Sequence, residues 1–227
     1  MPLAARHRDD PAPELAPIAG MTVHRETDPA VMAGIQGRAV DDMARRFADG
    51  HRAYVARIDG TPAAWGWVAT RAADIGELGT SFEIARGERY LWNFVTLKPF
   101  RGRGIYPRLI DGILGAERAE AERFWIAYAP ENRASGAGIA KAGFLTVAEL
   151  SFDTDGRPAL GDLRPGGAQV AARVLGIAES TTALAPCWRC VRAGRGAMAC
   201  AAGQCACDYQ VPASGCAAVT RASWVAA

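Results

Sequence analysis

The stretch TLKPFRGRGIY, residues 96–106, decides the fold, because it joins a predicted strand to a predicted helix. Residues 90–97 are aromatic and β-branched, which is typical of a buried strand. After the turn, apolar residues recur at helical spacing, and Pro107 stands where the first turn of a helix tolerates proline. These apolar residues are Ile105, Leu109, Ile110, Ile113 and Leu114. The sequence therefore predicts a strand, a tight turn and a helix in direct succession.

The composition of this turn favours a phosphate-binding site. Gly102 and Gly104 let the backbone turn tightly and leave its amide N–H groups uncovered. The N–H groups of the first helical turn, the helix dipole and the guanidinium groups of Arg101 and Arg103 then concentrate positive charge at one place. The alternative is an arginine-rich surface turn that caps an ordinary amphipathic helix. The turn lacks the pattern of a nucleotide-hydrolase phosphate loop and the third glycine of a dinucleotide fingerprint, which disfavours an NTPase or a dehydrogenase.

A second segment follows, with ENRAS at residues 131–135 and KAGF at residues 141–144. Together the two segments resemble the acyl-CoA signature of the GCN5-related N-acetyltransferase (GNAT) superfamily, over roughly residues 22–153. The resemblance implies an α/β fold in which helices flank a mixed, mostly antiparallel central sheet. It also implies acetyl-CoA as the acyl donor and direct transfer of the acetyl group to an amine.

The resemblance assigns residues to the cofactor. In this superfamily the strand before the turn and the strand after the following helix diverge, and the pantetheine arm enters the gap. The pantetheine residues would be Phe94, Val95 and Thr96. The pyrophosphate residues would be Arg101, Gly102, Arg103, Gly104, Ile105 and Tyr106. Tyr106 departs from the motif, which usually ends in Gly or Ala, and we expect its ring to point away from the backbone. Asn132 matches an asparagine that contacts the pantetheine arm; it also suits the N-cap of a helix, and the two roles are compatible.

The sequence offers one candidate for the acid of the reaction and one for the base. Transfer to an amine requires that the amine lose a proton and that the leaving thiolate be stabilised. Many relatives place a tyrosine acid seven residues after the motif asparagine, where this chain has Ile139. Tyr128 is the candidate substitute, with simple packing as the alternative. Glu77 is the candidate base, acting directly or through water, with a solvated loop carboxylate as the alternative.

Asn93 is the third catalytic candidate. It alternates with Trp92 and Phe94 in the predicted strand, so we expect it on the opposite face from both. A buried amide there must find hydrogen-bond partners, which suits a group that positions substrate or water. The three histidines lie outside both motifs and are weak candidates for the base.

Composition indicates a soluble globular protein. Of 227 residues, 50% are hydrophobic and 22% charged, and the formal net charge is +2. This balance favours neither nucleic acid nor a membrane as a partner, and no apolar run approaches the ~20 residues that span a bilayer. Residues 1–20 lack the apolar core of a signal peptide, so we expect a cytoplasmic protein with a flexible N-terminal tail. We expect the protein to be a monomer or a homodimer.

The remaining elements predict one catalytic domain over residues 21–157. Residues 53–58 and 61–70 form a predicted hairpin around Asp59 and Gly60. Trp65 and Trp67 share one face of its second strand, either in the core or as a wall of a substrate groove. The other predicted elements are a strand at 21–25, one or two helices at 30–47, a polar connection at 71–88, a helix to about 119, a strand at 123–129, a helix at 132–142 and a strand at 144–152.

All six cysteines fall near the C-terminus, after a predicted linker at residues 158–186 that contains one weak helix, 168–177. They are Cys187, Cys190, Cys200, Cys205, Cys207 and Cys216. The Cys-rich tail, 187–227, has few large apolar residues and cannot build a core unaided. The spacing suggests a thiolate zinc site that uses Cys187, Cys190, Cys205 and Cys207. A disordered extension and disulfide bonds are the alternatives.

The sequence thus favours an N-acetyltransferase that uses acetyl-CoA and a small-molecule or peptide amine. Two alternatives remain open. The first is a catalytically silent acyl-CoA-binding module, which the isoleucine at position 139 favours. The second is a metal-responsive interaction protein that acts through the Cys-rich tail.

Overall fold

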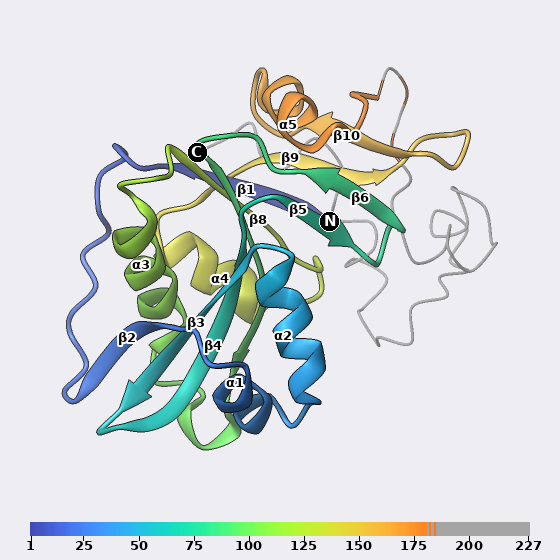
Figure 1. Ribbon diagram of the computed structural model, residues 1–227. Helices are drawn as coiled ribbons and strands as arrows, with labels where there is room; N and C mark the ends of the chain where they lie inside the picture. The colour runs from blue at the N-terminus through green and yellow to red at the C-terminus, as the bar shows by residue number, and fades with distance from the viewer. Residues whose placement is uncertain (181, 183, 185–227) are drawn as a thin grey trace.

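The computed structural model describes residues 1–180, 182 and 184, and within them a single large sheet organises the molecule (Figure 1). Its strand order is β10-β9-β1-β8-β7-β4-β3-β2. Every neighbouring pair is antiparallel except β7 and β8, which are parallel. The strands are β1 (Pro2–His7), β2 (Met21–Glu26), β3 (His51–Ile58), β4 (Thr61–Ala69), β7 (Glu88–Thr96), β8 (Arg123–Ala127), β9 (Leu145–Phe152) and β10 (Pro158–Asp162). The predicted mixed, mostly antiparallel sheet is confirmed.

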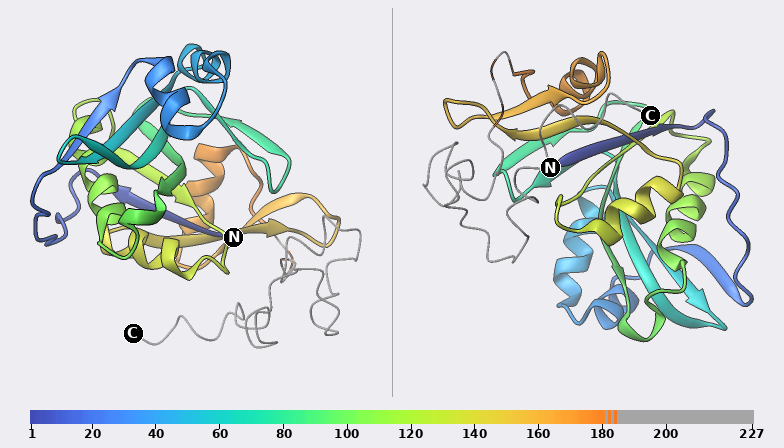
Figure 2. Two further views of the ribbon diagram at one scale, coloured as in Figure 1. Left: turned by 90° about the horizontal axis from the view of Figure 1, so that it is seen from below. Right: turned by 180° about the vertical axis from the view of Figure 1, so that it is seen from behind.

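Helices cover both faces of the sheet. On one face lie α3 and α4 (Figure 2). They pack on a core that includes Leu109, Ile113 and Phe124. On the other face, α1 and α2 cover β3 and β4, and α5 packs beside a short hairpin of β5 and β6. The helices are α1 (Pro29–Gln36), α2 (Val40–Ala48), α3 (Ile105–Glu117), α4 (Arg133–Lys141) and α5 (Gly167–Leu175). The hairpin strands β5 (Ala72–Ile75) and β6 (Thr80–Glu83) lie in the predicted polar connection, whose buried residues are Ala73, Ile75, Leu78, Phe82 and Ile84.

The hairpin of β3 and β4 forms as predicted. Asp59 and Gly60 both adopt positive φ, at 47° and 80°, and Ile58 pairs with Thr61 across them. A two-residue turn needs this conformation to match the twist of its strands, which is why Asp-Gly is a strong signal. None of the helices in the described part of the chain is long and apolar enough to cross a membrane.

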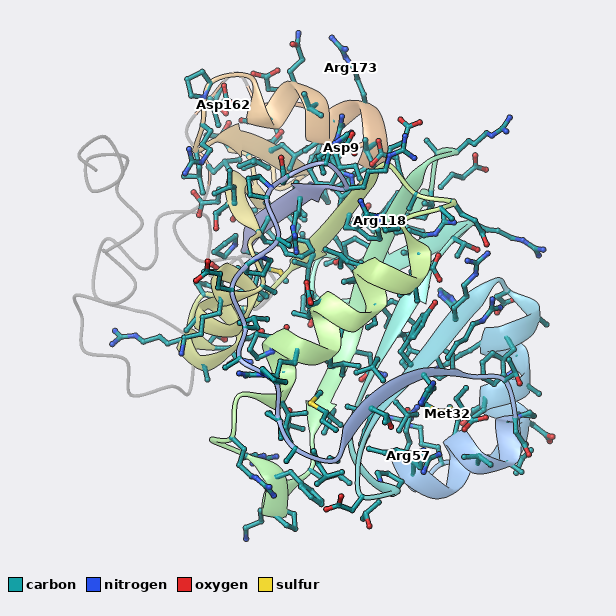
Figure 3. The ribbon with its side chains drawn as sticks, turned by 90° about the vertical axis from the view of Figure 1, so that its left-hand side faces the viewer. Asp9, Met32, Arg57, Arg118, Asp162 and Arg173 are labelled. Atoms are coloured by element: carbon teal, nitrogen blue, oxygen red, sulfur yellow. The ribbon has the colours of Figure 1, made fainter. Side chains whose placement is uncertain are left out.

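The expectation of a flexible tail over residues 1–20 is wrong for its first part. Residues 2–7 form β1, an interior strand that pairs antiparallel with β8 on one side and with β9 on the other. Leu3 and Ala4 are completely buried, one toward each face of the sheet. From β1 the chain passes along α3 (Figure 3). Arg108 of α3 donates hydrogen bonds to the carbonyl of Ala16 in this segment. The slot between β8 and β9 therefore orders a short segment that lacks the β-branched and aromatic residues by which a sequence predicts a strand.

The domain boundary expected at residue 157 is also wrong. β10 pairs with β9 along its whole length, and α5 packs on the same sheet. Leu160, Ala168 and Ala171 are fully buried in the core cluster that contains Leu150 and Phe152. The weak helix predicted at 168–177 is present as α5, at residues 167–175. The predicted linker thus belongs to the folded domain up to at least residue 180.

One buried carboxylate ties α3 to the sheet. The side chain of Glu117 is fully buried and accepts hydrogen bonds from Arg52 Nη1 at 2.7 Å, Arg89 Nε at 2.8 Å and the hydroxyl of Tyr54. Burial alone would raise the pKa of Glu117, but these three hydrogen bonds outweigh it and hold the pKa below the ordinary value. Arg52 and Arg89 also bind Glu120, which completes the network.

Candidate active site

The site begins where β7 and β8 diverge. Their parallel pairing ends at Leu91 opposite Ile126, while β7 continues to Thr96 along β4. At this point Asn93 has a φ of +51°, and the register with β4 shifts between Trp65 and Trp67. This is a β-bulge, which re-aims the residues that follow it. The divergence that the GNAT resemblance implies is present in the structure.

The bulge corrects the expectation for Asn93. Trp92 packs among the residues beneath α1 and α2, whereas Phe94 packs on the α3 side of the sheet. These two residues therefore lie on opposite faces, because the positive φ at Asn93 interrupts the strand alternation. Asn93 itself is exposed rather than buried. Gly66 makes room for the redirected ring, since a Cβ there would lie 2.2 Å from Phe94 Cε1.

The turn after β7 has the backbone that the phosphate prediction needs. A short 3₁₀ helix, η1 (Lys98–Phe100), leads into Gly102 and Gly104, whose φ values are +76° and +70°. Gly104 is the N-cap of α3, and within the described residues no side chain caps this helix. The N–H groups of the first turn of α3 are thus left for a ligand, at the positive end of the helix dipole.

The two arginines of the turn lie differently. Arg101 lines the cavity next to the turn, and its Nε donates a hydrogen bond to the carbonyl of Thr96 at 3.1 Å. The guanidinium carbon of Arg103 lies 5.6 Å from the ring centroid of Phe100, and Arg103 is absent from the described lining of that cavity. The structure therefore supports a direct ligand contact for Arg101 but not for Arg103.

Helix α4 closes the other side of the site. Asn132 caps it, because its Oδ1 accepts a hydrogen bond from the backbone N–H of Ser135 at 3.0 Å. The glycines that weaken this helix in the sequence have a packing reason. A Cβ on Gly136 would lie 2.8 Å from Cε2 of Tyr128, and a Cβ on Gly138 would lie 2.4 Å from Cδ1 of Tyr106. Each glycine leaves room for one tyrosine ring.

Tyr106 projects from α3 toward α4, away from the backbone of the turn as expected. Its ring meets that of Phe94 at a centroid distance of 5.3 Å and an angle of 63°. Its hydroxyl lies 3.3 Å from Ser135 Oγ. Burial raises the pKa of Tyr106 to about 12, against a smaller opposing effect of the hydrogen bond with Ser135.

A first cavity of about 620 Å³ lies between the turn and α4. The predicted cofactor residues that line it are Phe94, Val95, Thr96, Arg101, Gly102, Gly104, Ile105, Tyr106 and Asn132. Helix α4 adds Ser135, Gly138 and Lys141, which the sequence did not assign to the cofactor individually. The signal for them was the second motif segment, in which Ser135 and Lys141 stand.

A second cavity of about 550 Å³ lies on the other side of the diverging strands. Glu77, Asn93 and Tyr128 all line it, so the structure brings the three predicted catalytic residues together. Glu77 also affects the pKa of Tyr90. Burial raises this pKa, and the negative charge of Glu77 raises it further. Asp74 adds a second carboxylate to the lining. Both carboxylates are exposed; Asp74 lies in β5 and Glu77 in the connection between β5 and β6.

The two cavities share a wall. Four residues belong to the lining of both, namely Phe94, Tyr106, Asn132 and Ser135. Ligands bound in the two cavities would therefore approach each other at this wall.

The tryptophans belong to the core. Trp67 is fully buried and Trp65 is 7% exposed, within the cluster beneath α1 and α2. Trp67 lies against Phe47 at a centroid distance of 5.3 Å. His51, whose pKa burial lowers, lies against Trp92 rather than in a cavity described here. Of the two interpretations of Trp65 and Trp67, the structure supports core packing.

The Cys-rich tail lies outside the described residues, and with it the predicted zinc ligands Cys187, Cys190, Cys205 and Cys207. In the part of the chain that the structure describes, no three His, Cys, Asp or Glu side chains gather as a metal site would require. The zinc site remains a prediction.

Solved structures of acetyltransferases are similar to this chain. A GCN5-related N-acetyltransferase from Kribbella flavida is 20% identical, with 55% of this chain and 46% of that chain covered and a TM-score of 0.40. A protein from Novosphingobium aromaticivorans, described as belonging to the GNAT family, is 23% identical, with 64% and 59% covered and a TM-score of 0.43. AAC(6')-Iy in complex with the bisubstrate analogue CoA-S-monomethyl-acetylneamine is 20% identical, with 59% and 97% covered and a TM-score of 0.43.

The chain spans about half of the length of the first two of these proteins, 46% and 59%. Neither a protein-family model nor a curated protein matches the sequence. The mixed, mostly antiparallel sheet flanked by helices and the divergence of β7 from β8 are the features of the fold that the GNAT resemblance implies.

Proposed function

We propose that the protein is an N-acyltransferase that moves an acetyl group from acetyl-CoA directly to the amine of a small molecule or peptide. The observation that carries the proposal is the wall that the two cavities share. One cavity is bounded by a turn suited to pyrophosphate, and the other is lined by carboxylates and an amide. A donor in the first and an acceptor in the second would meet at Tyr106 and Ser135.

The residues of the first cavity fit acetyl-CoA. A Cβ on Gly102 would meet nothing within 4 Å, so the backbone of the turn is open on that side. The N–H groups at the start of α3 and the guanidinium group of Arg101 suit a pyrophosphate. The edge of β7 beyond Leu91, no longer paired with β8, suits the amides of the pantetheine arm. When bound, acetyl-CoA supplies an acyl group activated as a thioester.

The residues of the second cavity would prepare the acceptor. Glu77 is the candidate to take the proton of the amine, directly or through water, because it lines this cavity and its negative charge acts on Tyr90, a residue of the same lining. Asn93 and Tyr128 would hold the acceptor or a water by hydrogen bonds. The exposed edge of this cavity suits an amine that enters from solvent.

One observation favours a second candidate, a catalytically silent acyl-CoA-binding module. Ile139 is 2% exposed and packs in the core beneath α4, so the position of the usual tyrosine acid carries no hydroxyl group. This candidate shares the first cavity with the acyltransferase and differs in having no acceptor.

The two candidates differ in thiol release from acetyl-CoA. The purified full chain, supplied with acetyl-CoA and a panel of small amines and peptide N-termini, should release free thiol only when a suitable amine is present. Binding of acetyl-CoA with no amine-dependent release across the panel would favour the silent module. A folded protein that does not bind acetyl-CoA would contradict both. Elemental analysis of protein purified without chelator tests the separate prediction of about one zinc per chain in the Cys-rich tail.

A further inference from the structure

The shared wall limits which side chains can reach the reacting atoms. Of its four residues, Phe94 has no polar side-chain group, and Asn132 caps α4 through its Oδ1, which leaves its Nδ2 for the pantetheine contact that the GNAT resemblance implies. Tyr106 and Ser135 remain, with their hydroxyl oxygens 3.3 Å apart. Their hydroxyl groups therefore form the polar centre of the wall between donor and acceptor.

The position of the Tyr106 hydroxyl group is fixed from several sides. The ring packs on Gly138, where any larger residue would collide with it, and against the edge of Phe94. The hydroxyl group meets Ser135 on the facing helix. A side chain held between two helices in this way keeps one geometry, as a group that stabilises charge must.

We infer that the hydroxyl group of Tyr106 donates a hydrogen bond to the sulfur that leaves during acyl transfer, with Ser135 as the residue that positions it. This inference rests on the proposed function, because it needs a thioester at the shared wall. In the transfer step the amine nitrogen bonds to the acyl carbon, the carbon–sulfur bond breaks, and sulfur keeps the electron pair. The amine proton passes to Glu77 or water, and solvent protonates the released thiolate.

The inference moves the leaving-group role from Tyr128, which the sequence favours, to Tyr106. Tyr128 lines the second cavity but is not among the described residues of the first, so it lies on the acceptor side. Two departures from the GNAT motif then have one explanation. The chain has Ile139 in place of the usual tyrosine and Tyr106 in place of the usual small residue. The ring of Tyr106 packs on α4 at Gly138, where the absence of a side chain leaves room for it.

The state of the phenol agrees with this role. Burial raises the pKa of Tyr106 to about 12, so the group remains a hydrogen-bond donor throughout the neutral and mildly alkaline range. A donor of this kind stabilises a thiolate without giving up its proton. The charged groups of the two linings are those of Arg101, Lys141, Asp74 and Glu77 and the N-terminal ammonium group of Met1. All of them are retained in the variants described next, so they do not obscure a difference between the variants.

The test is the pKa of the thiol of bound CoA, measured from thiolate absorbance in the ultraviolet, for the wild-type full chain and for Tyr106→Phe. The substitution keeps the ring and removes only the hydroxyl group. A hydrogen bond to the thiolate lowers the thiol pKa, so the value should be higher in Tyr106→Phe than in wild type by about one unit. Tyr128→Phe is the matched control and should give the wild-type value for the bound thiol.

Activity supplies a second readout. Tyr106→Phe should lower kcat by about 10²-fold, the effect typical of one lost transition-state donor, with CoA affinity changed by less than about twofold. Gly138→Ala, which displaces the ring but keeps the phenol, should also raise the pKa of the bound thiol. Equal thiol pKa values in wild type and Tyr106→Phe, or a rise in Tyr128→Phe instead, would overturn the inference while CoA binding still supports the proposed function. A wild-type chain that does not bind CoA would overturn the proposed function, and this inference with it.

Discussion

Gly138 of α4 leaves the space that the ring of Tyr106 from α3 occupies. A Cβ added to Gly138 would lie 2.4 Å from Cδ1 and 2.9 Å from Cε1 of the tyrosine ring. Real Cβ atoms do not come this close, so the ring can occupy its place only because residue 138 is glycine. Glycine costs a helix roughly 1 kcal/mol relative to alanine, and in α4 the packing of Tyr106 offsets this cost.

Gly138→Ala should therefore destabilise the protein despite the better helix propensity of alanine. We expect the free energy of unfolding to fall by about 1–3 kcal/mol, the usual range for overpacking. Gly115→Ala in α3 is the matched control, because a Cβ there meets nothing within 4 Å, and it should stabilise by up to about 1 kcal/mol. Chemical denaturation measures both changes. Stabilisation of similar size by both alanines would show that the ring does not need the glycine.

Arg101 and Arg103 give a matched pair for the phosphate contact. Arg101→Ala should weaken the binding of acetyl-CoA by about tenfold, because Arg101 lines the first cavity. The loss should shrink at high salt, where ionic contacts are screened. Arg103→Ala should change affinity by less than about twofold, since its guanidinium lies over Phe100. Calorimetry at two salt concentrations measures the affinity of both variants for acetyl-CoA. A larger loss of affinity in Arg103→Ala than in Arg101→Ala would place the pyrophosphate on the other side of the turn.

Glu77→Gln tests the assignment of the base. If Glu77 takes the amine proton, kcat should fall by ~10²-fold or more and the acidic limb of the pH–rate profile should change. Binding of acetyl-CoA should barely change, because Glu77 lines only the acceptor cavity among those described. Glu83→Gln in β6, an exposed glutamate outside both described linings, is the control. A wild-type rate and profile in Glu77→Gln would leave a water chain as the base.

The buried carboxylate of Glu117 predicts how stability depends on pH. Its pKa in the folded protein is lower than the ordinary value of 4.5, so it contributes stability above that value and loses it as pH falls through the folded-state pKa. The free energy of unfolding should therefore decrease below about pH 4.5. Glu117→Gln should cost about 3 kcal/mol at pH 7, because Arg52 and Arg89 lose their buried partner, and should weaken the acid dependence.

The exposed Glu122→Gln serves as the control for this prediction, with an expected change within about 0.5 kcal/mol. Denaturant titrations at several pH values between about 3 and 7 provide the measurement. An unchanged slope in Glu117→Gln would assign the acid sensitivity to other carboxylates.

Truncation tests the revised domain boundary. Removal of residues 158–227 should abolish cooperative unfolding, because it takes away β10 and α5 and uncovers Leu150 and Phe152. A chain that ends at residue 184 should unfold cooperatively and bind acetyl-CoA like the full chain, since the described lining residues lie between 1 and 141. Circular dichroism on heating, together with calorimetry, separates the two outcomes. A stable and binding-competent 1–157 fragment would restore the original boundary.

Local sequence patterns were sufficient for the central elements. The Asp59-Gly60 turn, the strand before the glycine-rich turn and the spacing of apolar residues in α3 each follow from short-range physical preferences, and all are present. Asn132 is an N-cap because its side chain accepts a hydrogen bond from the backbone N–H of Ser135, a local interaction that does not depend on distant parts of the chain.

Features that depend on distant partners could not be predicted in this way. β1 is a strand because a slot between β8 and β9 accepts it, and β9 lies about 140 residues away in the chain. The bulge at Asn93 moves Phe94 to the opposite face of the sheet, and no residue pattern in the sequence predicts this bulge. Tyr106 could be recognised as a departure from a motif, but its role depends on Gly138 in another helix.

Calorimetric titration of acetyl-CoA into the full chain, for wild type and for Gly104→Val, tests the central claim most directly. The account predicts saturable binding of one acetyl-CoA per wild-type chain. It also predicts at least tenfold weaker binding in Gly104→Val, roughly 1.4 kcal/mol, because a side chain at this left-handed N-cap would disturb the backbone that faces the pyrophosphate. Circular dichroism establishes that the variant is folded. Absence of saturable binding to folded wild-type protein, or unchanged affinity in folded Gly104→Val, would contradict the account.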